Sequence, residues 1–120
     1  RDRMVAVHAP GLDGGDIPHL AYSTESGLGR IASACVPSVT VATGESPAFT
    51  SHLAAALRGA AVGGAGYAWL PLQLVAGDLA DGRLVRMAGD LPEIDINICI
   101  FRQGVLSAAA ERVWKRVLLA

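Results

Sequence analysis

The sequence has little charge and almost no excess of either sign. Charged residues make up 18% of the 120-residue chain and hydrophobic residues 52%, with a formal net charge of -1. Disordered chains have the opposite composition, so we expect a single folded domain with an aliphatic core. A surface that binds duplex nucleic acid needs a basic field, which this composition lacks. Nucleic acid is therefore not expected to be a direct partner of these residues.

Long apolar runs, a leader pattern and paired cysteines are also missing. No stretch reaches the roughly 18–20 apolar residues of a membrane span, and the pattern of a signal peptide is not found at the start of the sequence. We therefore expect a soluble, cytoplasmic protein without a membrane partner. The only two cysteines, Cys35 and Cys99, stand far apart between aliphatic residues. This predicts buried, unreactive thiols in a reducing compartment. The chain begins at Arg1, and its first methionine, Met4, lies in an apolar stretch, which indicates part of a longer protein.

The common motifs of catalysis are absent from the sequence. It contains no GxxxxGK followed by Ser or Thr, and no HExxH, GxSxG or DxDxG, which argues against the corresponding phosphate, zinc, hydrolase and calcium sites. The histidines show no metal-ligand spacing, and the acidic residues of the second half are interpreted as solvated side chains. We therefore expect no enzyme, no cofactor and no metal site. The residues considered are His8, His19, His52, Asp78, Asp81, Asp90, Glu93 and Asp95.

What the sequence does contain is a regular alternation of short strands and amphipathic helices. Runs of aliphatic and β-branched residues between Gly and Pro indicate the strands, and apolar residues three and four positions apart indicate the helices. This alternation predicts an α/β domain with a mixed, largely parallel sheet flanked by helices. The predicted strands are 3–8, 17–23, 38–43, 67–70, 83–88 and 94–102, and the predicted helices are 23–36, 46–62, 72–79 and 105–120.

Two of these helices begin with hydroxyl residues that can cap them. Ser23 is predicted to be the N-cap of the first helix, which ends before Pro37. Ser46 is predicted to cap the second helix, with Pro47 in its first turn, where a missing N–H is tolerated. The predicted buried stripes are Leu28, Ile31, Ala32 and Cys35 on the first helix and Phe49, Leu53, Ala56, Leu57 and Ala60 on the second.

The same helix starts define a candidate binding crevice. In an open α/β sheet, ligands bind at the carboxyl ends of strands, beside helix N-termini that supply unpaired N–H groups. A glycine loop at 63–66 stands before another predicted strand. We expect the segments 23–26, 46–48 and 64–66 to be neighbours and to form a site that binds without catalysing. Simple capping explains the hydroxyl residues equally well.

A short glycine motif offers an alternative function. Residues 27–32, GLGRIA, fit GxGxxA, whose glycines let the backbone approach a pyrophosphate at a helix N-terminus. In a dinucleotide fold the first glycine directly follows the strand, whereas residues 23–26 intervene here. The main interpretation is a helix start eased by glycine. The alternative is a nucleotide-binding fragment of an α/β enzyme that uses Gly27-Leu28-Gly29.

A long motif in the second half of the chain carries a family resemblance. Residues 64–85, GAGYAWLPLQLVAGDLADGRLV, fit GxGxAxLPxxLVxxxLxxGxLV. PHLAYS at 18–23 precedes this motif, and an Ile-rich strand and a final helix follow it. In this order the sequence resembles the effector-binding domain of LysR-type transcriptional regulators over nearly its whole length. Residues 21–30, AYSTESGLGR, are further similar to the branch that contains the hypochlorite-responsive regulator.

The resemblance implies one lobe of a fold like that of type II periplasmic binding proteins, with residues 1–120 forming the second lobe and a closing helix. It also implies a small effector in a cleft between two lobes, a homo-oligomer, and DNA contact only through a winged helix-turn-helix that this sequence lacks. A solute-binding lobe for transport is a third possibility, disfavoured by the missing signal peptide. The implied effector-binding residues are Tyr22, Ser23, Thr24, Ser26, Thr43, Ser46, Gly64, Gly66 and Tyr67.

The last predicted helix has a continuous apolar face. Its large side chains recur at helical spacing, and the resemblance implies that the first lobe, absent here, would cover them. We therefore expect the face to be exposed in this chain and to drive self-association, as a dimer or by exchange of the helix between chains. The residues of this stripe are Leu106, Ala110, Val113, Trp114, Val117 and Leu118.

Overall fold

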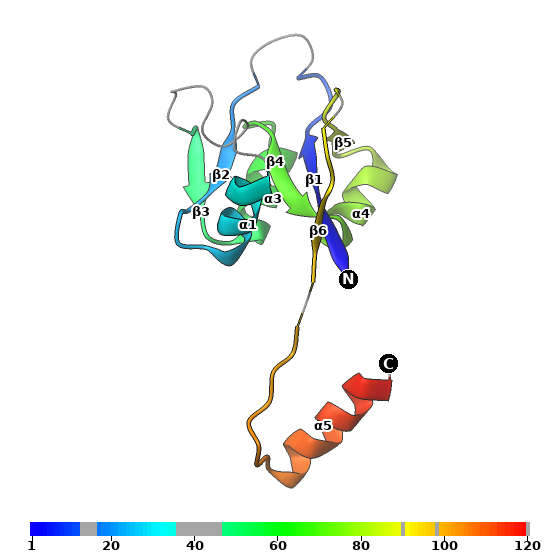
Figure 1. Cartoon of the computed structure of the whole chain (residues 1–120). Helices are drawn as coiled ribbons and strands as arrows, with labels where there is room; N and C mark the ends of the chain where they lie inside the picture. The colour runs from blue at the N-terminus through cyan, green and yellow to red at the C-terminus, as the bar shows by residue number, and fades with distance from the viewer. Residues whose placement is uncertain (13–16, 36–46, 90, 98, 120) are drawn as a thin grey trace.

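The computed structural model describes residues 1–12, 17–35, 47–89, 91–97 and 99–119. Its central strand is β1 (Asp2–His8), whose run of aliphatic residues is buried in the middle of a four-stranded sheet (Figure 1). Strand β4 (Ala68–Pro71) pairs with one side of β1, while β6 (Ile94–Ile96) and β5 (Val85–Arg86) pair with the other side. All three strands are antiparallel to β1.

A second, two-stranded sheet continues this arrangement. Strand β2 (Leu20–Tyr22) pairs in parallel with β3 (Phe49–Ser51), and a single parallel bridge from His19 to Tyr67 sets β2 beside the start of β4. Strands β2 to β6 therefore all run in one direction and β1 alone runs against them. The mixed sheet predicted from the sequence is confirmed. The expectation that it is largely parallel is wrong for the pairing, because β1 pairs antiparallel with β4, β5 and β6 and, among the described residues, only β2 and β3 form a parallel ladder.

Four helices accompany these strands in the described part of the chain. They are α1 (Gly27–Cys35), α3 (Ala54–Val62), α4 (Leu72–Asp81) and α5 (Ala108–Leu119). Helix α4 ends where the sequence predicts a turn, because Gly82 adopts the left-handed conformation with φ 78° that closes the last turn. Ser107 caps helix α5, since the backbone N–H of Ala110 donates to Ser107 Oγ at 3.2 Å, and the helix begins three residues after its predicted start at 105.

Some predicted elements are shorter than expected, and one begins elsewhere. The strands predicted at 17–23, 83–88 and 94–102 form regular pairs only at β2, β5 and β6. The helix predicted from 46 is wrong at its start, because Phe49–Ser51 pairs with β2 as strand β3 and the helix begins only at Ala54. Phe49 and Leu53 of its predicted buried stripe are consequently exposed. The strand predicted at 38–43 lies outside the described residues.

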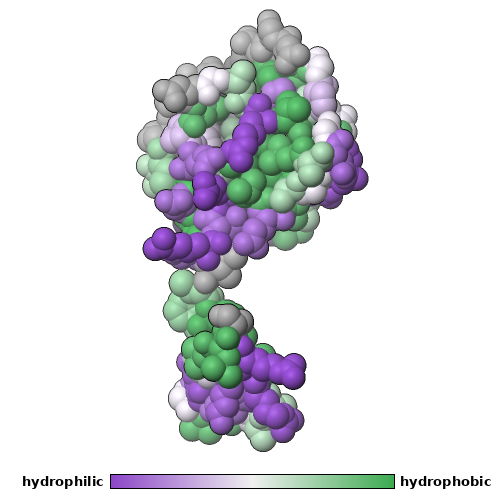
Figure 2. All heavy atoms as spheres, turned by 90° about the vertical axis from the view of Figure 1, so that its right-hand side faces the viewer, coloured by the Kyte–Doolittle hydropathy of each residue, from purple (hydrophilic) through white to green (hydrophobic). Residues whose placement is uncertain are grey.

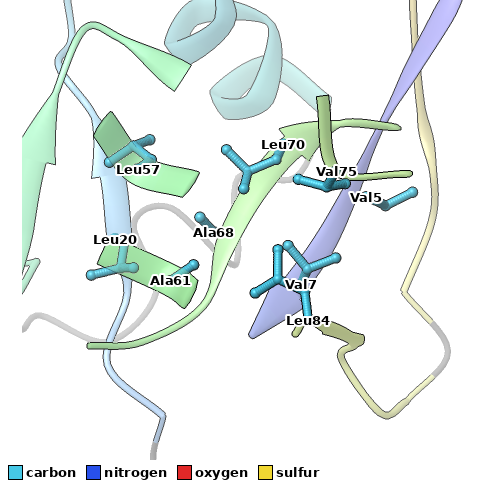
Figure 3. Close-up of a cluster of buried hydrophobic side chains, with 9 residues drawn as sticks. All are labelled: Val5, Val7, Leu20, Leu57, Ala61, Ala68, Leu70, Val75 and Leu84. Carbon is cyan, nitrogen blue, oxygen red and sulfur yellow. The ribbon is translucent and has the colours of Figure 1, made fainter. Parts of the chain in front are cut away.

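Alternation along β1 and β4 divides the core between the two faces of the sheet. On one face, helices α3 and α4 cover the side chains of Val5, Val7, Ala68 and Leu70 (Figure 3). On the other face, α1 contributes Ala32 to a second cluster. The core residues of the first face are Val5, Val7, Leu20, Leu57, Ala61, Ala68, Leu70, Val75 and Leu84, and those of the second are Met4, Ala6, Ala32, Tyr67, Trp69, Ile94 and Ile96.

A buried ion cluster ties the two helices of the first face together. Asp78 of α4 is only 1% exposed and accepts from Arg58 of α3, with Nε to Oδ2 at 2.6 Å and Nη2 to Oδ1 at 2.8 Å. Arg83 adds a contact from Nε to Oδ1 at 3.1 Å. The hydrogen bonds from Arg58 hold the pKa of Asp78 below its ordinary value. The interpretation of Asp78 as a solvated side chain is therefore wrong.

The predicted burial of both thiols is also wrong, because Cys35 and Cys99 are exposed. Only Gly29 and Ala32 are fully buried on α1, so the apolar stripe does not extend to Cys35 at the end of the helix, and Ile31 is 38% exposed. Strand β6 ends at Ile96, which leaves Cys99 outside the sheet.

Helix α5 stands apart from the rest of the fold, below an extended segment in Figure 1. None of its described residues is buried, and Val113 and Leu118 are 63% and 65% exposed. Arg102 of the preceding segment lies over the Trp114 ring, 5.5 Å from its centroid, and pairs with Glu111. Figure 2 shows the apolar residues that reach the surface of this part. The predicted exposure of the apolar face is confirmed.

Candidate functional site

The carboxyl ends of β2, β3 and β4 meet at one edge of the fold because these strands run in the same direction. A groove of about 430 Å³ is lined by residues of β2, of the turn that follows it and of helix α1. This is the region in which open α/β sheets bind their ligands. The residues that line the groove are His19, Leu20, Ala21, Tyr22, Ser23, Thr24, Gly29, Ala32, Ser33, Pro47, Thr50 and Trp69.

The turn from β2 into α1 forms one end of the groove and is built by two serines. The N–H of Ser23 donates to the carbonyl of Ser51 at 2.9 Å, which holds the end of β2 beside β3. Ser26, rather than the predicted Ser23, caps α1, because its Oγ accepts from the N–H of Gly29 at 2.9 Å. Ser26 Oγ also donates to the Ser23 carbonyl at 3.0 Å. The Ser23 side chain therefore lines the groove instead of capping the helix.

Packing in this turn accounts for the second glycine of the GxGxxA motif. A Cβ atom on Gly29 would lie 2.6 Å from Ser26 Oγ and 2.7 Å from the Ser23 carbonyl oxygen. Gly27, by contrast, has open space around it. Gly29 is therefore needed for the close approach of the helix to its own cap, which favours the helix start eased by glycine over a nucleotide site.

The structure brings together only part of the predicted site. Tyr22, Ser23 and Thr24 line the groove, and Ser26 lines a neighbouring recess with Glu25 and His52. Thr43 and Ser46 lie outside the described residues, but Pro47 lines the groove opposite α1.

The glycine loop lies at the other end of β2. Tyr67 donates its N–H to the Pro18 carbonyl at 2.9 Å, and a Cβ atom on Gly66 would lie 2.2 Å from that same oxygen. The expectation that Gly64 and Gly66 neighbour Ser23 is wrong, because a loop that precedes a parallel strand lies at the amino ends of the strands. Tyr67 does not line the groove itself, but its ring stacks on that of His19, which does, with the ring centroids 4.9 Å apart.

Sequence reasoning missed two residues of the groove, Trp69 and His19. The indole of Trp69 is 2% exposed, and its Nε1–H has no hydrogen-bond partner within the described part of the chain. Burial lowers the pKa of His19, so its ring is neutral at pH 7. The alternation of YAWL placed Trp69 and Tyr67 on one face, and a Trp on a buried face usually needs a partner for its N–H.

The chemistry of the groove suits binding rather than catalysis. No Asp, Glu, Lys or Arg lines it among the residues that the structure describes, and its polar side chains carry hydroxyls and the imidazole of His19. No set of three potential metal ligands occurs among the described residues. In the same parts of the chain, no helix is long and apolar enough to cross a membrane.

Comparison with known proteins places this geometry in a family. The family model of the LysR substrate binding domain matches residues 1–119. VV2_1132, a LysR family transcriptional regulator, is 34% identical over 71% of this chain and 28% of its own, with a TM-score of 0.61. The apo-form regulatory domain of HypT from Salmonella typhimurium is 25% identical over 98% of this chain and 60% of its own, with a TM-score of 0.74. No curated protein sequence matches the chain.

A third structure supports the fold alone. Vibrio fischeri DarR, solved in complex with DNA, is 22% identical over 95% of this chain and 41% of its own, with a TM-score of 0.72. The chain thus spans about a quarter of VV2_1132 and three-fifths of the HypT regulatory domain. Its fold is α/β and like that of type II periplasmic binding proteins. The chain belongs to the LysR substrate-binding domain family.

Proposed function

We propose that this chain is the effector-sensing part of a LysR-type transcriptional regulator and not part of an enzyme. Residues 1–120 form the second lobe of the effector domain together with its closing helix. The family match over residues 1–119 carries this proposal. The regulator acts in the cytoplasm as a homo-oligomer and contacts DNA through a winged helix-turn-helix outside these residues.

The groove along β2 supports this proposal because it offers binding groups without catalytic ones. A small molecule in the groove contacts Tyr22, Ser23 and Thr24 at the edge where β2 ends. A ligand that binds the closed arrangement of the two lobes more tightly than the open one shifts the population towards closure. Closure then changes the angle between the DNA-binding domains of the oligomer.

A groove-blocking substitution in the whole regulator tests this proposal. Ser33 is exposed and lines the groove, whereas Ala34 is exposed on the same helix and does not line it. Binding of the regulator to DNA from upstream of its own gene is measured by fluorescence anisotropy, with and without fractions of cell metabolites. We expect one fraction to shift the DNA-binding midpoint of the native regulator and of Ala34→Leu. Ser33→Leu should bind DNA normally and lose the response.

Two results would contradict the proposal. If no metabolite fraction shifts DNA binding, the effector-sensing role fails. If Ser33→Leu and Ala34→Leu respond equally, the sensing site lies elsewhere than in this groove.

A second candidate function is an oxidant response. HypT is a hypochlorite-specific regulator, and its full-length structure is 26% identical over 97% of this chain and 42% of its own. The specific observation is the exposure of both thiols, which makes them accessible to oxidants. If this chain senses an oxidant, hypochlorite should alter DNA binding of the whole regulator, and Cys35→Ser or Cys99→Ser should abolish that change.

A further inference from the structure

The indole of Trp69 carries a buried hydrogen-bond donor that no described residue satisfies. Trp69 stands on β4 and is 2% exposed, yet its Nε1–H has no partner. Most buried polar groups in proteins are paired, so an unpaired one requires an explanation. Trp69 is also one of the residues that line the groove along β2. Because the nitrogen itself is buried, a partner that enters from the groove reaches this N–H when the side chains over the indole move apart.

Among the described residues, the surroundings of Trp69 offer no acceptor for this donor. Its ring packs in the apolar cluster that contains Met4, Ala32 and Ile94. The hydroxyl of Tyr22 donates to the Trp69 backbone carbonyl at 2.8 Å, which fixes the strand and engages that hydroxyl as a donor. Since an indole nitrogen donates and does not accept, the partner must bring an acceptor.

We propose that the groove takes a neutral, largely apolar ligand whose carbonyl oxygen accepts a hydrogen bond from Trp69 Nε1–H. This inference rests on the proposed function, because it specifies the class of effector for the same groove. A ligand carboxylate would find no Arg or Lys among the described lining residues. Burying an unpaired charge is far more costly than burying a carbonyl that is hydrogen-bonded.

Size and polarity agree with such a ligand. A volume of about 430 Å³ lies in the lower part of the range of small-molecule sites. The wall contributed by Leu20, Ala32 and Pro47 is apolar. The imidazole of His19 is neutral at pH 7, because burial lowers its pKa, and thus adds no positive charge. A substituted aromatic ketone or aldehyde has the required combination of an apolar ring and one acceptor.

Three probes of similar size separate the possibilities. Acetophenone has an aromatic ring and a carbonyl, ethylbenzene has the ring without an acceptor, and benzoate has the ring with a negative charge. The ¹⁵N-labelled 120-residue chain has two indole N–H resonances, from Trp69 and Trp114, and Trp114 serves as an internal control. Acetophenone should shift the Trp69 resonance downfield in a saturable manner and leave that of Trp114 unchanged. It should bind about tenfold more tightly than the other two probes.

Substitution of each tryptophan provides matched variants. Trp69→Phe should reduce acetophenone affinity to that of ethylbenzene, and Trp114→Phe should leave both affinities unchanged. The proposal is overturned if saturating acetophenone leaves the Trp69 resonance in place, or if benzoate binds more tightly than acetophenone. Should Trp69→Phe fail to fold, the resonance of the native chain decides the question alone.

The outcome can be separated from that of the proposed function. If acetophenone binds at Trp69 while Ser33→Leu keeps its metabolite response, the ligand chemistry holds and the sensing role of the groove fails. If Ser33→Leu loses the response while acetophenone does not bind, the groove senses an effector of a different class.

Discussion

Arg58 and Asp78 form a two-point ion pair that joins α3 to α4, with contacts of 2.6 and 2.8 Å on the two carboxylate oxygens. Because Asp78 is buried, the change to Asn leaves the guanidinium of Arg58 without its counter-charge and replaces one of its two acceptor oxygens with an NH2 donor. We expect Asp78→Asn to lower the melting temperature clearly more than Asp81→Asn, whose ion pair with Arg83 is exposed. Thermal unfolding by circular dichroism measures both. Equal effects of the two substitutions would contradict the importance of burial.

The same pair predicts a direction of pH dependence. The Asp78 pKa in the folded chain lies below its ordinary value of 3.8, so the unfolded chain binds the proton more readily. The stability from this pair is therefore fully present above about pH 5 and is lost as the pH falls through 3.8 to the folded pKa. Melting temperatures from pH 6 to pH 2 should fall less steeply for Asp78→Asn than for the native chain. Parallel curves would count against this assignment.

Gly29→Ala should destabilise the chain by about 1–3 kcal/mol, because the added methyl group would overlap the Ser26 hydroxyl and the Ser23 carbonyl. Gly27→Ala is the matched control, with no atom within 4 Å of the added Cβ. It should change stability by no more than about 0.5 kcal/mol or increase it slightly. Urea unfolding gives both values. A neutral Gly29→Ala would show that the turn relaxes without loss.

Both thiols should react with Ellman's reagent in the native chain, since Cys35 and Cys99 are exposed. We expect two thiols to be titrated per chain without denaturant, and one each in Cys35→Ser and Cys99→Ser. If either thiol reacts only after unfolding, its exposure in solution differs from that found here.

The apolar face of α5 should drive self-association of the 120-residue chain. Exposed large side chains cost roughly 1.5–3 kcal/mol each relative to burial, which favours contact with a second copy. Sedimentation should show an oligomer at high concentration. Val113→Glu should shift it towards the monomer, and Arg112→Glu should not, because Arg112 lies off the apolar stripe. A native chain that stays monomeric with a buried Trp114 would indicate a helix folded back on its own sheet.

The sequence predicted the elements whose signals are local. Strand β1 is a continuous aliphatic run, and α4 stands between Pro71 and Gly82, which bound a helix whatever lies nearby. Strand β3 could not be predicted in this way, because Phe49–Ser51 is a strand only through its pairing with β2, thirty residues earlier. The Ile alternation after Ile96 likewise overpredicted β6, which pairs only with the amino end of β1.

In the candidate site, the sequence correctly singled out the turn after β2. It did not single out Trp69 and His19, which also line the groove. Hydroxyl residues after a strand are a local signal, and Tyr22, Ser23 and Thr24 do line the groove. The glycine loop was misplaced because composition does not tell whether a loop lies at the amino or the carboxyl end of a strand. Trp69 was not singled out, since only the packed structure shows that its N–H lacks a partner among the described residues.

The reversed direction of β1 has a mechanical consequence. Because β1 is antiparallel to β6, the start of β1 and the end of β6 lie side by side, with Asp2 paired to Ile96. The first residues of β1 and the last residues of β6 therefore lie at the edge of the fold where β2, β3 and β4 end. Hinge motions between domains are absorbed by a few residues at the ends of such elements. A second lobe joined at these two strand ends would move across the mouth of the groove as it turns, so a ligand bound in the groove would hold it at one angle.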